Sequence, residues 1–290
     1  IHTMTKVLIL GATGLLGIQL SDFLEQEGYN IIRHGYSSKA DYKADMKEPL
    51  EAQKMFEDSN PDFIINLIAL TDVDRCEKDP NAAYLLNVRP VENILFWFSG
   101  HPHVKVIHIS TDHVYDGVGP HTENDITIRN TYAFSKYCAE HVALRANGCV
   151  LRTNFFGKSR TRVRLSFSDW MVKSLQEQKT IKLFTEVKFS PLSIQTLSKM
   201  ILLVINNFKS GTFNLGSSAG MSKRDFAILL ANKLGLNIKH AEDALSTDIK
   251  LTAYRPTDMR MDSTLFEKTF RVKLPTLPEE IETVREEYEY

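Results

Sequence analysis

Residues Lys6–Gly17, with the sequence KVLILGATGLLG, are the clearest indication of the fold class. The apolar run Lys6–Leu10 is typical of a buried strand, and glycines follow at positions 11, 14 and 17, where a helical pattern begins. A glycine-rich turn lets backbone N–H groups approach a phosphate closely, and a helix N-terminus favours negative charge. The stretch therefore predicts a dinucleotide-binding loop, with a plain tight turn as the alternative.

Strand-like and helical stretches alternate after this loop. Further strands are expected at 29–33, 62–67, 104–110 and 149–153, and helices at 15–26, 49–58, 80–98 and 130–145. Strands separated by helices pair in parallel and are covered on both faces. We therefore predict an α/β fold with a Rossmann-type, doubly wound parallel sheet.

The second half of the chain is less regular. Helices are expected at 167–178, 195–206 and 223–234, and short strands at 181–184 and 211–214. We predict an NAD(P)-binding Rossmann domain over 4–155, to which part of 190–215 returns. A smaller mixed α/β substrate-binding lobe is expected over 156–290, and its acidic end, 279–290, is predicted to be a solvated terminal helix.

Composition excludes several classes of protein. The 290 residues include 35 Lys plus Arg against 36 Asp plus Glu, which gives a formal net charge of −1. Such a charge does not attract nucleic acid or anionic lipid. No apolar run approaches the ~20 residues of a membrane helix. The three cysteines form no CxxC pair and the histidines have no metal-ligand spacing. We expect a cytoplasmic protein with reduced thiols, no metal site, and no nucleic-acid or membrane partner.

The end of the second strand predicts which dinucleotide is bound. NAD sites usually present an acidic residue there, and residues 32–39, IRHGYSSK, contain none. The residues suited to a 2′-phosphate are Arg33, Ser37, Ser38 and Lys39. Asp45 and Met46 are candidates for the adenine amino group. NADP(H) is therefore preferred and NAD(H) is the alternative; in the rival interpretation Arg33 and Lys39 are solvated surface charges.

Tyr132 and Lys136 form a YxxxK pair, which lies on one face if the segment is helical. A neighbouring cation favours the phenolate and makes the phenol a readier proton donor. Thr111 follows the strand at 104–110, and the carboxyl ends of parallel strands line the ligand crevice. We predict that the hydroxyls of Thr111 and Tyr132 lie near one carbonyl oxygen and that Lys136 acts together with the phenol. The alternative is a Tyr/Lys pair on a helix surface and a Ser or Thr that caps a helix.

Three motifs together resemble the extended short-chain dehydrogenase/reductase superfamily: GATGLLG at 11–17, STDHVYDG at 110–117 and YAFSK at 132–136. Within it, the chain resembles the dTDP-4-dehydrorhamnose reductase group. Supporting stretches are NLIALTDVD at 66–74, LNV at 86–88, RTN at 152–154, GTFNLG at 211–216 and RP at 255–256.

The resemblance implies a role for each matching residue. Thr111 holds the substrate oxygen, Tyr132 protonates it, and Lys136 binds the nicotinamide ribose. Besides the four residues suited to the 2′-phosphate and Asp45 and Met46, the cofactor-binding residues are Gly11, Thr13, Gly14, Leu15, Leu16, Gly17, Ala69, Leu70, Thr71, Asn87, Tyr132 and Lys136. The substrate-binding residues are Thr71, Asp112, His113, Asn154 and Arg255, with Arg255 at the nucleotide diphosphate.

Departures from the family patterns define the expected reaction. The resemblance implies that sugar-nucleotide dehydratases of this superfamily carry Thr-Asp-Glu where this chain has Thr111-Asp112-His113. Without that Glu, the elimination of water lacks its base. The reductase group usually has Tyr at the position of His113. We predict NAD(P)H-dependent reduction of a nucleotide-activated 4-keto-6-deoxy sugar for surface polysaccharide synthesis, by a chain that forms a homodimer. The alternatives are an epimerase with tightly bound NAD and a non-catalytic NADP-binding regulatory subunit.

Overall fold

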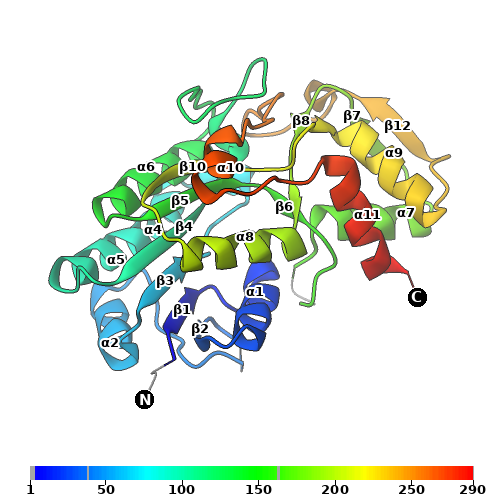
Figure 1. Ribbon diagram of the computed structural model, residues 1–290. Coiled ribbons are helices and arrows are strands. Elements are labelled where there is room, and N and C mark those ends of the chain that lie inside the picture. The colour runs from blue at the N-terminus through cyan, green and yellow to red at the C-terminus, as the bar shows by residue number, and fades with distance from the viewer. Residues whose placement is uncertain (1–3, 38, 162–163, 290) are drawn as a thin grey trace.

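The computed structural model describes residues 4–37, 39–161 and 164–289 (Figure 1). Its centre is a six-stranded sheet with the order β10-β5-β4-β3-β1-β2, in which every pair is parallel. The strands are β1 (Lys6–Leu10), β2 (Asn30–His34), β3 (Phe63–Asn66), β4 (Lys105–Thr111), β5 (Cys149–Thr153) and β10 (Gly211–Leu215). The predicted parallel sheet of Rossmann type is confirmed.

Both faces of the sheet are buried, as the doubly wound prediction requires. Val7 and Ile9 of β1 pack into one core cluster, and Leu8 and Leu10 into another on the opposite face. Because successive strand residues point to opposite faces, each strand needs helices on both sides. One face carries α1 (Leu15–Gln26), α8 (Ile194–Asn206) and α10 (Thr264–Phe270). The other face carries α2 (Pro49–Ser59), α4 (Pro80–Asn87), α5 (Arg89–Gly100) and α6 (Thr131–Arg145).

The single helix predicted over 80–98 is wrong. The structure has two helices there, α4 and α5, which meet at Val88. Pro90 is the cause, because proline has no N–H to donate to the carbonyl oxygen four residues earlier and its ring would clash with that carbonyl. Pro90 is tolerated in the first turn of α5, where N–H groups have no helical partner.

The strand order reverses between β1 and β3. From β1 the chain adds β2 on one side and then crosses to add β3 on the other. The loops that leave the carboxyl ends of β1 and β3 therefore diverge and open a crevice between them. This crevice is where the glycine loop and the segment at 67–72 face each other.

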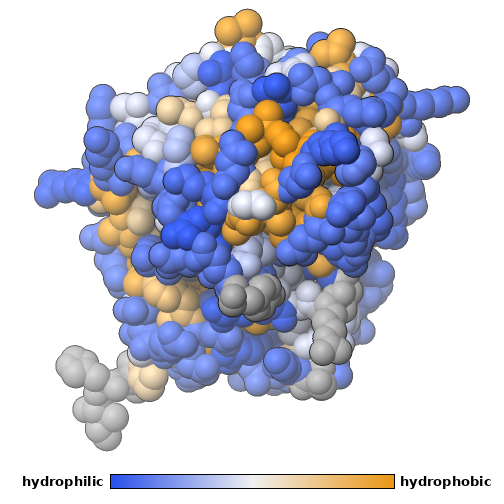
Figure 2. Space-filling view, turned by 90° about the vertical axis from the view of Figure 1, so that its right-hand side faces the viewer, coloured by the Kyte–Doolittle hydropathy of each residue, from blue (hydrophilic) through white to orange (hydrophobic). Residues whose placement is uncertain are grey.

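The second lobe lies to one side of the sheet (Figure 1). Its core is formed by α7 (Phe167–Gln176), α9 (Lys223–Leu234) and α11 (Leu277–Tyr288). Short strand pairs join it: β7 (Ile181–Phe184) with β12 (Ala241–Ala244), β8 (Lys188–Phe189) with β11 (Met221–Ser222), and β6 (Phe155–Phe156) with β9 (Leu192–Ser193). Figure 2 shows this side, where hydrophobic side chains gather near the centre and hydrophilic ones surround them.

The segment between the two halves of this lobe returns to the sheet. Helix α8 packs against α1, and β10 pairs with β5. The remaining elements of the described residues are α3 (Val73–Lys78) and two short 3-10 helices, η1 (Asp112–Val114) and η2 (Ser246–Asp248). Within the described residues, no helix is both long and apolar enough to cross a membrane.

The terminal helix is not simply solvated, so this part of the sequence prediction is wrong. Leu277, Ile281 and Val284 of α11 are fully buried in the core of the second lobe. These positions share one helical face, and most of the acidic residues occupy the other. Glu280 is also buried, because its carboxylate accepts hydrogen bonds from the Ser193 N–H and from the Thr196 hydroxyl.

Candidate active site

The glycine loop leaves the N-terminus of α1 open. Gly11 has a φ of +81°, and Gly14 takes the N-cap position, where no described side chain caps the helix. A Cβ on Gly17 would lie 2.2 Å from the Gly11 carbonyl oxygen, so only glycine allows α1 to pack so closely on its own loop. The uncapped N–H groups of the first turn therefore fit a pyrophosphate.

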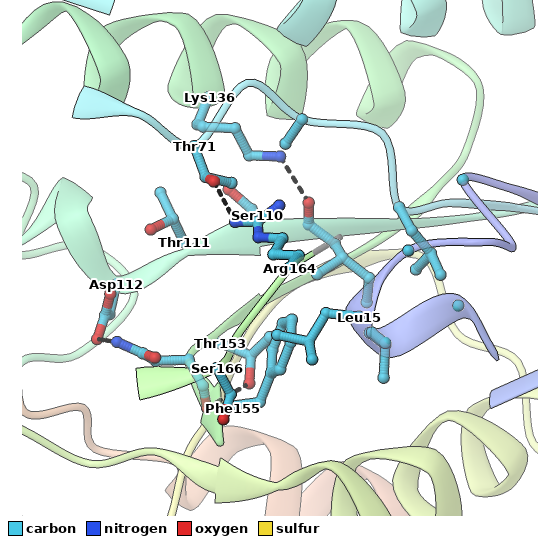
Figure 3. A pocket seen from close by; sticks show the side chains of 18 of the residues that line it. Leu15, Thr71, Ser110, Thr111, Asp112, Lys136, Thr153, Phe155, Arg164 and Ser166 are labelled. Atoms are coloured by element: carbon cyan, nitrogen blue, oxygen red, sulfur yellow. Dashed lines mark hydrogen bonds between the residues drawn. The ribbon is translucent and has the colours of Figure 1, made fainter. Parts of the chain in front are cut away.

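A cleft of about 340 Å³ runs from this loop along the carboxyl ends of β1, β3, β4 and β5 (Figure 3). It brings together most of the residues predicted for the site: Gly11, Gly14, Leu15, Leu16, Gly17, Ala69, Thr71, Thr111, Asp112, His113, Tyr132, Lys136 and Asn154. Its wall also contains residues that sequence reasoning did not name: Leu67, Ile109, Ser110, Thr153, Phe155, Arg164, Leu165, Ser166 and Phe167.

Tyr132 lies in the wall of the cleft as a buried phenol. Burial raises the pKa of Tyr132 to about 12, although a hydrogen bond with the Thr111 side chain and the charge of Arg164 oppose the rise. The phenol therefore carries its proton at neutral pH and is a potential donor. We expected Lys136 to favour the phenolate, but burial outweighs any such effect in this structure.

Lys136 is fixed at the floor of the cleft. Its Nζ donates a hydrogen bond to the Ile109 carbonyl oxygen of β4 at 2.8 Å, and only 2% of the residue is exposed. Burial lowers the pKa of Lys136 to about 8, and the nearby Glu140 carboxylate opposes this. A cation remains beneath the cleft around neutral pH, one helical turn from Tyr132.

A buried ion pair supports this floor from below. Arg152 of β5 and Glu140 of α6 lie 2.7 Å apart, with side-chain exposures of 4% and 1%. Ser110, in the cleft wall, donates a hydrogen bond from its hydroxyl to Glu140, and the Tyr115 hydroxyl accepts one from the Arg152 guanidinium. Because both charges are paired and hydrogen-bonded, the network fixes α6 against β4 and β5.

The far end of the cleft holds two incompletely bonded polar side chains. Asp112 accepts a hydrogen bond from Asn154 at its Oδ2 (2.9 Å), whereas its buried Oδ1 has no partner in the described part of the chain. Burial raises the pKa of Asp112 to about 6. The buried Nδ1 of His113 likewise lacks a described partner, and burial lowers the pKa of His113 to about 3. The His113 ring meets the Tyr132 ring edge-on, with centroids 5.3 Å apart.

The residues predicted for the adenosine end are only partly in position. The Arg33 guanidinium pairs with Glu25 (2.9 Å) and Asp22 (3.4 Å) on α1. Met46 is buried in the core beneath α2. Three others lie near the surface, Ser37 and Lys39 exposed and Asp45 half-buried. Ser38 lies outside the described residues. The 2′-phosphate site stays a prediction.

Four further predicted residues do not line the cleft but are held by other residues of the chain. Asn87 is fully buried, accepts from the Leu70 N–H (2.6 Å) and donates to the Leu70 carbonyl oxygen, so both residues hold the loop beside Ala69 and Thr71. Thr13 packs directly beneath Gly35, where a Cβ would meet its hydroxyl at 2.3 Å. Arg255 forms an ion pair with Asp74 at 3.0 Å.

Two cations next to the cleft were not identified individually from sequence. Arg164 belongs to the basic stretch at 158–164, and its guanidinium donates to the Thr71 hydroxyl (Figure 3). Lys223 begins α9, and its ammonium lies 5.1 Å from the ring centroid of Phe167. Nothing in the local sequence distinguishes Lys223 from an ordinary first-turn lysine. Its charge nevertheless lowers the pKa of Asp112, an effect that depends on the packing of the second lobe.

Comparison with known proteins agrees with this geometry. A parallel doubly wound sheet, an uncapped glycine loop, and Thr, Tyr and Lys in one cleft define the extended short-chain dehydrogenase/reductase class. The family model described as the RmlD substrate binding domain matches residues 4–290. The chain belongs to this family.

Relatives of similar length support the assignment. A probable low-salt glycan biosynthesis reductase of Haloferax volcanii is 26% identical, covering 94% of this chain and 95% of that protein. The dTDP-4-dehydrorhamnose reductase of Salmonella typhimurium is 29% identical, with 93% of each chain covered. A dTDP-4-dehydrorhamnose reductase of Bacillus anthracis, solved with NADP, superposes with a TM-score of 0.87 at 24% identity, covering 97% and 99% of the two chains.

Proposed function

We propose that this protein is an NADPH-dependent reductase of a nucleotide-activated 4-keto-6-deoxy sugar, whose product serves polysaccharide synthesis. Membership of the family and the names of the relatives support sugar-nucleotide reduction. The observation that carries the proposal is the convergence of Thr111, Tyr132 and Lys136 in one cleft that begins at the glycine loop.

The described residues fit a dinucleotide. The open N-terminus of α1 offers N–H groups to a pyrophosphate, and the loop that Asn87 holds runs along the opposite side of the cleft. When bound, the reduced nicotinamide supplies a hydride to the carbon of the keto group. The Lys136 ammonium, fixed one helical turn from Tyr132, is placed to donate a hydrogen bond to the ribose.

The chain itself supplies the proton. Reduction of a ketone places negative charge on its oxygen, and hydrogen-bond donors already directed at that oxygen stabilise the charge. Thr111 orients the oxygen, and Tyr132 donates its phenolic proton to it. The high pKa of the buried phenol keeps that proton in place until charge develops, and the Lys136 cation below stabilises the phenolate that remains.

The preference for NADPH over NADH rests on Arg33, Ser37 and Lys39, and on the NADP found in the Bacillus anthracis relative. Arg33 is paired with Glu25 and Asp22 in this structure. Binding of a 2′-phosphate therefore includes an exchange of these carboxylates for the phosphate, which a planar guanidinium can accommodate through paired hydrogen bonds.

A turnover assay tests the proposal. Purified protein is mixed with NADPH and a panel of nucleoside-diphosphate 4-keto-6-deoxy sugars, and the loss of NADPH absorbance is followed. We expect turnover with at least one of them and a lower KM for NADPH than for NADH. Binding of cofactor without turnover of any of them would reject the reductase.

The same preparation separates the rival functions. A sugar-nucleotide epimerase retains bound NAD through purification and shows no net oxidation, so the released nucleotide identifies it. A regulatory subunit binds NADP, co-purifies with a larger enzyme and leaves the keto sugar unchanged. The intact Tyr132 and Lys136 favour catalysis over this role.

The proposal includes the finer expectations as well. Residues 4–155 and part of 190–215 bind the cofactor, and 156–290 bind most of the sugar nucleotide, with Arg255 at the diphosphate. The enzyme acts in the cytoplasm, where nucleotide sugars are made. A homodimer remains a prediction, which sedimentation of the purified protein tests.

A further inference from the structure

We propose that Asp112 binds the 3-hydroxyl of the keto sugar through its free carboxylate oxygen, and that Lys223 of the second lobe holds this carboxylate in its charged form. The inference rests on the proposed function and deepens it. It makes Asp112 a residue that selects the substrate, and Lys223 a positioning residue that acts through Asp112.

One carboxylate oxygen of Asp112 is free to accept a hydrogen bond from a ligand. The residue begins η1 at the carboxyl end of β4, lines the cleft, and is 1% exposed. Asn154 donates to its Oδ2, while the buried Oδ1 has no partner in the described ranges. A buried oxygen without a hydrogen bond is costly, so a donor on the ligand would complete the site. Figure 3 places Asp112 and Leu15 of the glycine loop far apart along the cleft.

The chemistry of the sugar identifies the donor. In a 4-keto-6-deoxy sugar, C4 is flanked by C3, which carries a hydroxyl, and by C5, which carries a methyl group and the ring oxygen. Thr111 and Tyr132 hold the keto oxygen, and Asp112 follows Thr111 directly in the chain. Of the two carbons next to C4, only C3 carries a donor, so the 3-hydroxyl is the group from which Asp112 would accept a hydrogen bond. A charged carboxylate accepts hydrogen bonds and donates none, so it requires that hydroxyl.

Lys223 supplies a cation without a competing partner. Its ammonium lies 5.1 Å and 5.8 Å from the ring centroids of Phe167 and Phe189. Among the described residues it has no hydrogen bond or ion pair, unlike its neighbour Arg224, which pairs with Asp243 at 2.7 Å. Burial lowers the pKa of Lys223, the Asp112 carboxylate opposes this, and the charge of Arg255 adds to it. The charge of Lys223 in turn lowers the pKa of both Asp112 and His113.

The other groups around Asp112 do not replace Lys223. Asn154 is neutral, and burial keeps the adjacent His113 uncharged. Tyr132, which faces Asp112 from α6, carries its proton, and the carboxylate raises the pKa of that phenol further. Burial raises the pKa of Asp112 to about 6 even with Lys223 present, so loss of this cation would leave the carboxyl protonated nearer to neutral pH.

Substrate discrimination tests the role of Asp112. We compare kcat/KM for a 4-keto-6-deoxy sugar nucleotide and for its 3-deoxy counterpart, in the wild type, Asp112→Asn and Asp112→Ala. We expect the wild type to prefer the 3-hydroxyl about 100-fold or more and the variants to lose most of that preference, because an unpaired site group rejects the analogue. The Kd for NADPH should stay the same. Equal preference in wild type and variants would overturn the assignment.

A pH profile tests Lys223. In Lys223→Met, the acid limb of kcat/KM should move upward by about one pH unit, as expected for removal of a nearby opposite charge. Lys223→Arg should restore the wild-type limb, and Asp112→Asn should flatten it. Arg224→Met is the matched control, since it removes an adjacent but already paired cation. A limb that stays in place in Lys223→Met contradicts the proposal.

A double-mutant cycle on unfolding keeps this test independent of turnover. The free energy of unfolding is measured for the wild type, Asp112→Asn, Lys223→Met and the double variant at pH 8 and pH 5. We expect a favourable coupling at pH 8 that shrinks at pH 5, where Asp112 is protonated. If the wild type reduces no keto sugar, the proposed function and the 3-hydroxyl assignment fail, and the cycle still decides whether Lys223 keeps Asp112 charged.

Discussion

At the scale of single residues, burial controls the chemistry of the cleft more than charge pairing does. Tyr132, Lys136, Asp112 and His113 all have pKa values displaced toward their neutral forms, and burial is the largest cause in each case. Poor solvation of these buried groups strengthens the electrostatic contacts that remain between them. The sequence predicted these residue types at the site but not the direction of the shift at Tyr132.

Tyr132→Phe removes the proton donor and leaves the ring that packs against His113. We expect turnover to fall about 10²- to 10⁴-fold, the usual contribution of general acid catalysis, with the Kd for NADPH nearly unchanged. NADPH absorbance and a fluorescence titration measure the two quantities. Tyr137→Phe, five residues further along α6 and outside the cleft lining, is the control. A large loss of cofactor affinity in Tyr132→Phe would point to a structural role for the hydroxyl instead.

Asp112 makes stability depend on pH. Its pKa rises from 3.8 to about 6 on folding, so the charged form costs stability above pH 6 and this cost disappears as the pH falls toward 4. Asp112→Asn should therefore unfold with a free energy about 1 to 3 kcal/mol higher than the wild type at pH 8.

The extra free energy of unfolding of Asp112→Asn over the wild type should fade between pH 6 and pH 4. Urea titrations across that range measure it. Asp58→Asn, at an exposed position near the end of α2, should show no such trend. A difference that does not vary with pH would mean that Asp112 is not the titrating group.

At the scale of elements, the glycine loop depends on how closely α1 approaches it. Gly17→Ala places a Cβ against the backbone of Gly11 and Ala12, at 2.2 Å and 2.7 Å. We expect the free energy of unfolding to drop by about 1 to 3 kcal/mol, as for other overpacked sites, and NADPH binding to weaken sharply because the first turn of α1 shifts.

Gly100→Ala is the matched substitution, since no described atom lies within 4 Å of a Cβ at the end of α5. It should leave NADPH binding unchanged. Calorimetric titration and denaturant unfolding measure both variants. Wild-type cofactor affinity in Gly17→Ala would show that the loop tolerates a displaced helix and would weaken its assignment to the pyrophosphate.

At the scale of the whole molecule, the carboxyl-terminal helix joins the two lobes. Helix α11 packs in the second lobe, and Glu280 bonds the Ser193 N–H and the Thr196 hydroxyl at the start of α8, which packs on α1. Glu280→Ala leaves a buried N–H unpaired and should lower the free energy of unfolding by about 2 to 3 kcal/mol. Glu286→Ala, exposed on the same helix, should change it little. An equal loss of unfolding free energy in Glu280→Ala and Glu286→Ala would mean that the hydrogen bonds of Glu280 do not stabilise the contact between the lobes.

The parallel sheet and the three motifs that line the cleft could be predicted from the sequence alone. These depend on local patterns: apolar strands, glycine spacing and an i, i+4 pair on one helix. The sequence also predicted one helix over 80–98, because the apolar periodicity of this region continues across Pro90. Likewise, the acidic character of 279–290 concealed the apolar face of α11.

Which side chains from distant segments share the cleft depends on the packing of the folded chain. Lys223 lies more than one hundred residues after Asp112 in the chain, and no spacing rule connects them. Arg33 carries the right charge for a phosphate, yet α1 brings two carboxylates to it. The reason is physical: the period of a helix or strand sets contacts within an element, while contacts between elements depend on how whole faces pack.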